Sequence, residues 1–309
     1  MNALVGYTGF VGSNLYENGQ FDKVYNTKNI EEAYGTEPDL LVYSGLRAEK
    51  FLANKEPEKD YESILEAQKN IQRIRPKKLV LISTIDVFKN PQEVNENSNI
   101  DITDLHPYGM NRYKLECWVR ENYNDALIIR LPGLFGKNIK KNFIYDFINW
   151  IPAMLKEDKF IELSVHNPRI KEYYIRQENG FYKVRDLDSE GRDKLIQVLE
   201  IVNFNALHFT DSRSTFQFYP LYRLWSDIQI ALEHEIFLWH PATEPISAEE
   251  LYRYLTGNDF MNELPAEPAK YDYKTLYAEL YGGNNNYICS KEMVLQQIKV
   301  FVEQERKKL

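Results

Sequence analysis

The sequence predicts an α/β protein with a doubly wound parallel sheet. Short apolar runs alternate with amphipathic stretches through the first half of the chain, which is the pattern of repeated strand, helix, strand units. Residues 79–82 form an uninterrupted apolar run, as expected for a central strand that helices cover on both faces. A smaller region is expected in the C-terminal half, because the alternation becomes irregular after Gly136.

The elements of the first half can be placed in chain order. Apolar side chains at helical spacing, with Ile64 and Ile71 on the buried stripe, identify the longest helix. The strands are expected at residues 2–5, 24–25, 39–43, 79–82 and 126–129. The helices are expected from about Ser13, over residues 55–74, and from Pro107 or Tyr108 to about residue 119.

The second half offers fewer clear elements. Residues 143–155 have helical spacing, and residues 235–239 form a last apolar strand. Ser247 is a good helix N-cap because Glu250 stands three residues later, so that each side chain can bond the other's backbone. Residues 290–309 are expected to form a terminal helix that begins at another capping serine.

The composition argues against several classes of partner and site. A chain of 309 residues with a formal net charge of -8 lacks the cationic surface that general nucleic-acid binding needs. No stretch approaches the roughly 18 apolar residues of a membrane-spanning helix. Cys117 and Cys289 are far apart, so neither a disulfide framework nor a thiolate metal site is indicated, and the histidines lack metal-ligand spacing. We expect a cytoplasmic protein that binds no nucleic acid, membrane or metal.

Glycines occupy every third position after the first strand, at Gly6, Gly9 and Gly12. Without Cβ atoms the backbone can turn sharply, let a pyrophosphate approach, and present the N-terminus of the next helix to it. The segment therefore predicts a dinucleotide site, with a plain tight turn as the alternative. The other turn residues expected to contact the cofactor are Thr8, Phe10 and Val11.

Three later segments carry residues that could take part in catalysis or cofactor binding. Thr84 follows the fourth expected strand, Tyr108 and Arg112 stand at i and i+4 of the next helix, and residues 130–136, with Pro132, end the strand after it. Together with the glycine spacing, this order resembles the extended short-chain dehydrogenase/reductase family, of the NAD-dependent epimerase/dehydratase type. The resemblance covers roughly the first 136 residues, and residues 213–218 and 245–251 are similar to later parts of the family's main domain.

The resemblance implies a Rossmann-like fold, NAD or NADP as cofactor, and a small sugar-like substrate that could be a nucleotide sugar. Tyr108 would be the catalytic acid/base, because a tyrosine hydroxyl can exchange a proton with an alcohol or ketone when a cation, here Arg112, stabilises the phenolate. Thr84 would hydrogen-bond the substrate oxygen, and Asp86 and Arg213 would also bind substrate. Tyr108, Arg112 and Pro132 would line the cofactor. A homodimer is compatible with the resemblance.

The chain departs from the family's pattern at informative places. Arg112 replaces the usual lysine, and a guanidinium is wider and planar, so it is not equivalent in a proton relay. Ile85 and Asp86 stand where family dehydratases have Asp-Glu, which makes water elimination less favoured. After the second strand, Asn26 and Lys28 are the expected cofactor contacts, and the missing carboxylate there favours NADP over NAD.

The resemblance also predicts how the chain is divided into domains. Residues 1–136 would bind the dinucleotide and residues 137–209 would form the substrate side. Residues 210–257 would return to the first domain, and residues 258–309 would complete the substrate side. Net reduction and epimerisation of a secondary alcohol or ketone share the same residues. A catalytically silent dinucleotide-binding protein and a scaffold or interaction protein remain as alternatives of other classes.

Overall fold

The computed structural model describes residues 1–308, and these divide into two units. The first unit contains Met1–Ile139, Thr215–Ile246 and Ala269–Gln297. The second contains Lys140–Ser214, Ser247–Pro268 and the C-terminal segment from Ile298, whose last residue, Leu309, lies outside the described residues.

This division differs from the one expected from the sequence. Residues 247–257 were expected in the first domain and lie in the second unit. Residues 258–309 were expected on the substrate side as a block, whereas Ala269–Gln297 lies in the first unit. Long-range bonds explain the placement, because the buried Gln217 amide donates to the Tyr273 carbonyl at 2.8 Å and the Ile288 N–H donates to the Ala242 carbonyl at 2.8 Å. Such bonds leave no local pattern in the sequence.

A six-stranded sheet forms the centre of the first unit, in the order β12-β5-β4-β3-β1-β2. Every neighbouring pair is parallel, which confirms the predicted fold class. The strands are β1 (Asn2–Val5), β2 (Lys23–Tyr25), β3 (Leu40–Tyr43), β4 (Leu79–Thr84), β5 (Leu127–Leu131) and β12 (Leu238–Trp239). The strand order reverses between β1 and β3, and open parallel sheets bind ligands at the carboxyl ends of strands beside such a reversal.

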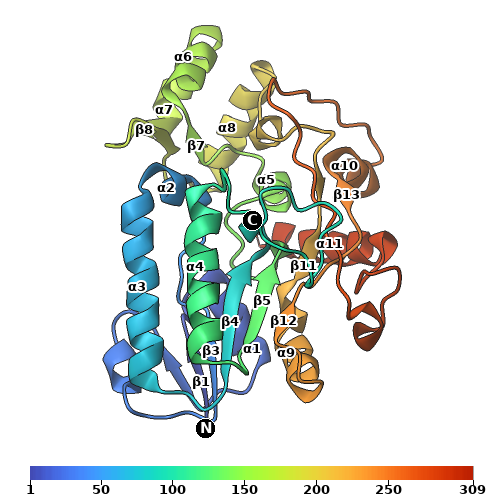
Figure 1. Cartoon of the computed structure of the whole chain (residues 1–309). Coiled ribbons are helices and arrows are strands. Elements are labelled where there is room, and N and C mark those ends of the chain that lie inside the picture. Colours follow the sequence, from blue (N-terminus) through green and yellow to red (C-terminus); the bar gives the residue numbers. More distant parts are fainter. Residues whose placement is uncertain (309) are drawn as a thin grey trace. The chain divides into compact units, whose positions relative to one another are not determined.

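Helices cover both faces of this sheet. Figure 1 shows α3 and α4 side by side on one face, with α1 and α9 on the other. The predicted stripe of α3, including Ile64 and Ile71, is fully buried in the core. The helices of this unit are α1 (Phe10–Asn18), α2 (Lys50–Lys55), α3 (Pro57–Ile74), α4 (Pro107–Asn122) and α9 (Leu224–Glu233). Its shorter strands are β6 (Gly133–Phe135), β10 (Thr215–Phe216) and β11 (Phe218–Pro220), while β13 (Ile246–Ser247) lies at the unit boundary.

Several predicted elements have different bounds in the structure. The helix expected over residues 143–155 ends at Asn149, because Trp150 takes φ 62° and Pro152 follows. The strand expected over residues 235–239 is reduced to β12, since Glu235 takes φ 52° and leaves the extended conformation. The first helix begins at Phe10 rather than about Ser13.

The second unit has its own core and a small antiparallel sheet in the order β7-β9-β8. Its elements are α5 (Phe143–Asn149), β7 (Met154–Leu155), α6 (Glu157–His166), α7 (Ile170–Tyr173), β8 (Tyr174–Arg176), β9 (Tyr182–Val184), α8 (Ser189–Ile201) and α10 (Ala248–Thr256). The predicted capping pair is confirmed, because the Glu250 N–H donates to Ser247 Oγ and the Ser247 N–H donates to Glu250 Oε2. The terminal helix, α11, covers Lys291–Arg306, and none of the helices described is long and apolar enough to cross a membrane.

Candidate active site

The glycine turn joins β1 to α1 at the carboxyl edge of the sheet. Gly6 takes φ +92°, a region that favours glycine, and a Cβ there would lie 2.5 Å from the carbonyl oxygen of Ser44. A Cβ on Gly12 would collide with the Gly6 carbonyl, whereas one on Gly9 would lie 3.3 Å from that oxygen. The backbone segments here approach each other so closely that positions 6 and 12 need glycine.

The turn leaves the N-terminus of α1 accessible. Gly9 is the N-cap residue, and no side chain of the described chain caps the helix there. Thr8 and Gly9 are exposed, while Phe10 and Val11 are half-buried. Because the first N–H groups of a helix lack intrahelical acceptors and sit at the positive end of its dipole, this end can accept an anionic group.

The segment after β2 lies beside the glycine turn. The Gly6 N–H donates to the carbonyl oxygen of Tyr25, the last residue of β2, at 2.7 Å. Asn26 follows directly, and its side-chain oxygen accepts the N–H of Lys28 at 2.8 Å. Lys28 is exposed and makes no ion pair within the described part of the chain. An exposed cationic residue therefore follows, three positions later, the strand end that the turn contacts.

Thr84 and Tyr108 meet because the start of α4 packs tightly on the turn that follows β4. Thr84 is the last residue of β4, and its hydroxyl accepts the Asp86 N–H at 3.2 Å. A Cβ on Gly109 would collide with the Asp86 carbonyl, so glycine permits this approach. The Tyr108 N–H donates to Asn54 Oδ1 at 2.9 Å, which fixes the first turn of α4.

Tyr108 is buried, with 7% of its surface exposed. Burial raises the pKa of its hydroxyl above the ordinary value, and this exceeds the opposing effects of the Arg112 charge and the Thr84 hydrogen bond, which lower the pKa. The negative charges of Asp86 and Asp60 raise the pKa further. The hydroxyl is therefore protonated at neutral pH.

Arg112 lies on the same face of α4 as Tyr108, as the i, i+4 spacing predicts. Its guanidinium carbon is 4.1 Å from the centroid of the Tyr108 ring. Only 4% of the Arg112 side chain is exposed, and Nη1 forms an ion pair with Asp60 while Nη2 donates to the Arg47 carbonyl at 2.6 Å. The cation thus contacts the ring face, and Asp60 on α3 balances its charge.

Asp86 is the centre of a polar cluster that sequence reasoning identified only in part. Its Oδ1 accepts the Tyr271 hydroxyl at 2.8 Å and lies 3.1 Å from Lys50 Nζ. Asp86 also acts electrostatically on Tyr108 and His106, so these five side chains share one environment. Lys50 and Tyr271 were missed because they are 36 and 185 residues from Asp86 in the sequence, and no spacing motif links them.

The buried carboxylate of Glu116 joins the elements that carry Thr84 and Tyr108. Glu116, eight residues after Tyr108 in the numbering, is fully buried and accepts the Ser83 hydroxyl at 2.6 Å. Its carboxylate also pairs with Arg130 on β5 at 2.7 Å. The ion pair and the serine bond hold α4, β4 and β5 together beside Thr84, which limits movement of the site.

The remaining predicted residues lie in different settings. Pro132 lies between β5 and β6, at the same carboxyl edge as Thr84, since Thr84 is paired with Leu131 in the sheet. Arg213 lies in the second unit, where its guanidinium pairs with Asp211 at 2.8 Å and with Glu263 at 3.0 Å. Its charge is therefore already balanced by two carboxylates.

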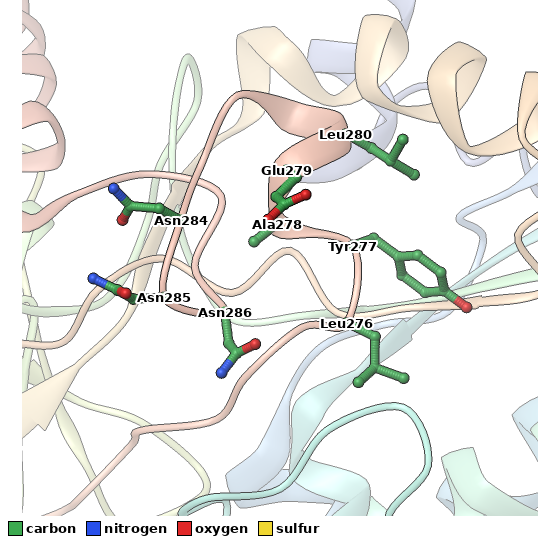
Figure 2. A pocket seen from close by; sticks show the side chains of 8 residues that line it. All are labelled: Leu276, Tyr277, Ala278, Glu279, Leu280, Asn284, Asn285 and Asn286. Atoms are coloured by element: carbon green, nitrogen blue, oxygen red, sulfur yellow. The ribbon is translucent and has the colours of Figure 1, made fainter.

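A separate hollow of about 280 Å³ lies in the C-terminal part of the first unit. Figure 2 shows the amide side chains of Asn284, Asn285 and Asn286 on one side of it and the segment from Leu276 to Leu280 on the other. None of the residues predicted from the sequence lines it. Within residues 1–308, no group of His, Cys, Asp or Glu side chains could hold a metal ion.

The chain is similar to known proteins in structure and not detectably in sequence. No family model and no curated protein matches the sequence. A solved dTDP-4-dehydrorhamnose reductase from Bacillus anthracis, in complex with NADP, is similar at TM-score 0.61 and 18% identity, over 98% of this chain and 97% of that one. The fold is that of the extended short-chain dehydrogenases/reductases.

Two epimerases of this fold are similarly related. A UDP-N-acetylglucosamine 4-epimerase from Methanobrevibacter ruminantium matches at TM-score 0.63 and 13% identity, over 100% of this chain and 98% of that one. A UDP-glucose 4-epimerase from Thermus thermophilus, in complex with NAD, matches at TM-score 0.61 and 14% identity, over the whole of both chains. At these identities the likeness establishes the extended short-chain dehydrogenase/reductase fold, and activity must be argued from the site.

Proposed function

We propose that this chain is an NAD(P)-dependent oxidoreductase or epimerase that acts on a secondary alcohol or ketone of a sugar-like substrate, which we take to be a nucleotide sugar. The observation that carries the proposal is the buried Tyr108 hydroxyl beside Thr84, at the sheet edge where the glycine turn opens. The similar solved structures are described as sugar-nucleotide reductases and epimerases with NADP or NAD, which supports the same chemical class.

The residues of the glycine turn fit a dinucleotide. Close approaches require glycine at positions 6 and 12, and the accessible start of α1 can receive a pyrophosphate. Residues 26–28, which follow β2, include no acidic residue that could bind the ribose 2′-hydroxyl of NAD. The exposed Lys28 suits the 2′-phosphate of NADP instead, so this segment favours NADP. When bound, the nicotinamide supplies or accepts the hydride.

Each site residue then has a role in proton handling or positioning. Tyr108 donates its proton to a carbonyl oxygen during reduction, or receives one from an alcohol during oxidation. Thr84 hydrogen-bonds the same substrate oxygen and orients it towards Tyr108. Asp86, which contacts Lys50 and Tyr271, accepts a hydrogen bond from a hydroxyl group of the sugar.

A binding protein without turnover is the second candidate, and the Arg112–Asp60 ion pair favours it. A cation paired with Asp60 and stacked on the tyrosine ring is poorly placed to relay a proton away from the Tyr108 hydroxyl. Such a protein would bind the dinucleotide and leave every sugar nucleotide unchanged.

Turnover with defined substrates separates the two candidates. NADPH and NADH would be mixed with nucleotide-linked 4-keto sugars, and oxidation of the nicotinamide followed by absorbance. UDP-hexoses would be incubated with NAD in parallel, and the sugar configuration followed by proton NMR. Turnover lost in Tyr108→Phe supports the proposed enzyme. Dinucleotide binding with no turnover of any substrate supports the silent protein and contradicts the enzyme.

A further inference from the structure

We propose that the second unit contains an anion-binding pocket that takes the phosphate or diphosphate group of a small molecule, through Lys183, Arg185 and Arg192. The pocket contains no residue of the glycine turn or of the Tyr108 site, and only its nucleotide-sugar outcome rests on the proposed function. It lies in the second unit, in the stretch Lys140–Ser214.

The pocket has the dimensions of a small-molecule site. Its volume is about 340 Å³, within the range of about 300–1,000 Å³ common for ligand cavities. It is formed by α5, the loop before β7, the end of β9 and the first turn of α8. The polar and charged side chains that line it include those of Tyr145, Asn149, Lys183, Arg185, Asp186 and Arg192.

The residues that line the cavity carry a net positive charge. Three cations line it against one carboxylate, Asp186, in a chain whose net charge is -8. Within residues 1–308, none of the three cations has a carboxylate oxygen within 4.0 Å. Neighbouring cations of the same unit behave differently, because Arg176 pairs with Glu157 at 3.2 Å and Lys194 pairs with Glu190 at 2.6 Å. Unpaired charges gathered around a hollow raise the local concentration of anions.

The backbone holds these cations in place. Lys183 is on β9 between Met154 of β7 and Ile175 of β8, so its strand is paired on both sides. The Arg185 N–H donates to the Tyr173 carbonyl at 2.8 Å. Arg192 lies in the first turn of α8, and its Nη2 is 3.5 Å from the Asn149 carbonyl oxygen. The backbone at each of the three cations is therefore held by bonds within the second unit.

The types of side chain favour phosphate among the anions. Two guanidinium groups can each give paired N–H donors to phosphate oxygens, and a lysine adds a mobile point charge. Tyr145 also lines the pocket, and a tyrosine hydroxyl can donate a further hydrogen bond. Arg213, the cation of this unit expected from sequence to contact a substrate phosphate, is instead neutralised by Asp211 and Glu263. The diphosphate of a nucleotide sugar and a separate phosphorylated metabolite share the required chemistry.

Titration calorimetry of the full chain with inorganic pyrophosphate tests the pocket, with saturating NADPH present to occupy the glycine turn. The wild type would be compared with the double variant Arg185→Gln/Arg192→Gln and with Lys171→Gln, which removes an exposed charge of the same unit outside the pocket. We expect pyrophosphate affinity to fall at least tenfold in the double variant and to stay unchanged in Lys171→Gln. If the double variant is misfolded by circular dichroism, Lys183→Gln replaces it, with the same expectation.

Two further arms keep this proposal separate from the proposed function. NADPH affinity should be equal in the wild type and the pocket variant, because the glycine turn is intact in both. Competition of a UDP-hexose with pyrophosphate identifies the nucleotide sugar as the source of the phosphate, whereas competition by glucose 6-phosphate alone identifies a phosphorylated metabolite. Pyrophosphate binding that is absent, or equally strong in the pocket variant, would overturn the proposal.

Discussion

Arg112 lies over the ring of Tyr108, with its guanidinium carbon 4.1 Å from the ring centroid, and forms an ion pair with Asp60. Asn111 also donates to the same Asp60 oxygen, at 2.9 Å. The cation that sequence reasoning assigned to the catalytic group therefore also joins α4 to α3. A single residue is placed to affect both the pKa of Tyr108 and the stability of the first unit.

Removing either partner of this pair should destabilise the fold. Arg112→Met leaves the buried Asp60 carboxylate without its cation, and breaking a buried pair costs about 3–5 kcal/mol. Urea unfolding followed by tryptophan fluorescence measures the change in the free energy of unfolding. The double variant Arg112→Met/Asp60→Leu should recover most of the loss, and a single variant as stable as the wild type would contradict the prediction.

Replacing Tyr108 by phenylalanine should abolish turnover and leave dinucleotide affinity nearly unchanged. The ring and its contact with Arg112 remain, and only the proton-donating hydroxyl is lost. General acid–base groups contribute about 10²–10⁴-fold to rate, so kcat should fall by at least that factor. Steady-state kinetics and NADPH titration on one preparation make the comparison. Tyr113→Phe, on the same helix, serves as the control, and unchanged turnover in Tyr108→Phe would remove this residue from the mechanism.

Asp86→Asn should weaken substrate binding more than cofactor binding. The change removes the charge that holds Lys50 and accepts the Tyr271 hydroxyl, and a hydrogen bond to a charged group contributes about 1.5–3 kcal/mol. We expect KM for the sugar substrate to rise roughly tenfold or more on that basis, with NADPH affinity unchanged. Asp101→Asn changes an exposed carboxylate and is the control. An unaltered KM would exclude Asp86 from the substrate site.

Local patterns predicted the sheet, the glycine turn and the helix that carries Tyr108. Each depends on neighbours in sequence, such as the apolar run of β4 or the pairing of Ser247 with Glu250. Such patterns can be recognised in the sequence because the hydrogen bonds and the burial behind them involve one element or two adjacent elements.

Interactions between distant segments escaped prediction for a physical reason. Asp60 is 52 residues from Arg112, and Tyr271 is 185 residues from Asp86, so only the folded chain brings them together. The positive φ of Trp150 ended a helix that apolar spacing would have continued. The ion pairs of Arg213 with Asp211 and Glu263 likewise could not be read from the prediction that this residue binds substrate.

Asp146 gives the second unit a distinct pH dependence. Burial raises the pKa of its carboxyl from the ordinary 3.8 to about 7 in the folded chain. Between these two values the unfolded chain releases a proton that the folded chain retains, so stability should fall as pH rises from about 4 to 7. Asp146→Asn should remove this slope and stabilise the protein at pH 7 by roughly 1–3 kcal/mol. Thermal unfolding at several pH values measures it, with the exposed Asp193→Asn as control; a slope that persists in Asp146→Asn would contradict the assignment.

Binding of the dinucleotide at the glycine turn is the claim on which the proposed chemistry depends. Titration of the protein with NADPH and NADH, followed by nicotinamide fluorescence, would be repeated with Gly9→Asp and with Gln20→Asp, which adds the same charge just beyond the far end of α1. The account predicts binding that is tighter for NADPH, lost in Gly9→Asp and retained in Gln20→Asp. Failure of the wild type to bind either dinucleotide would contradict it and favour a scaffold built on the same fold.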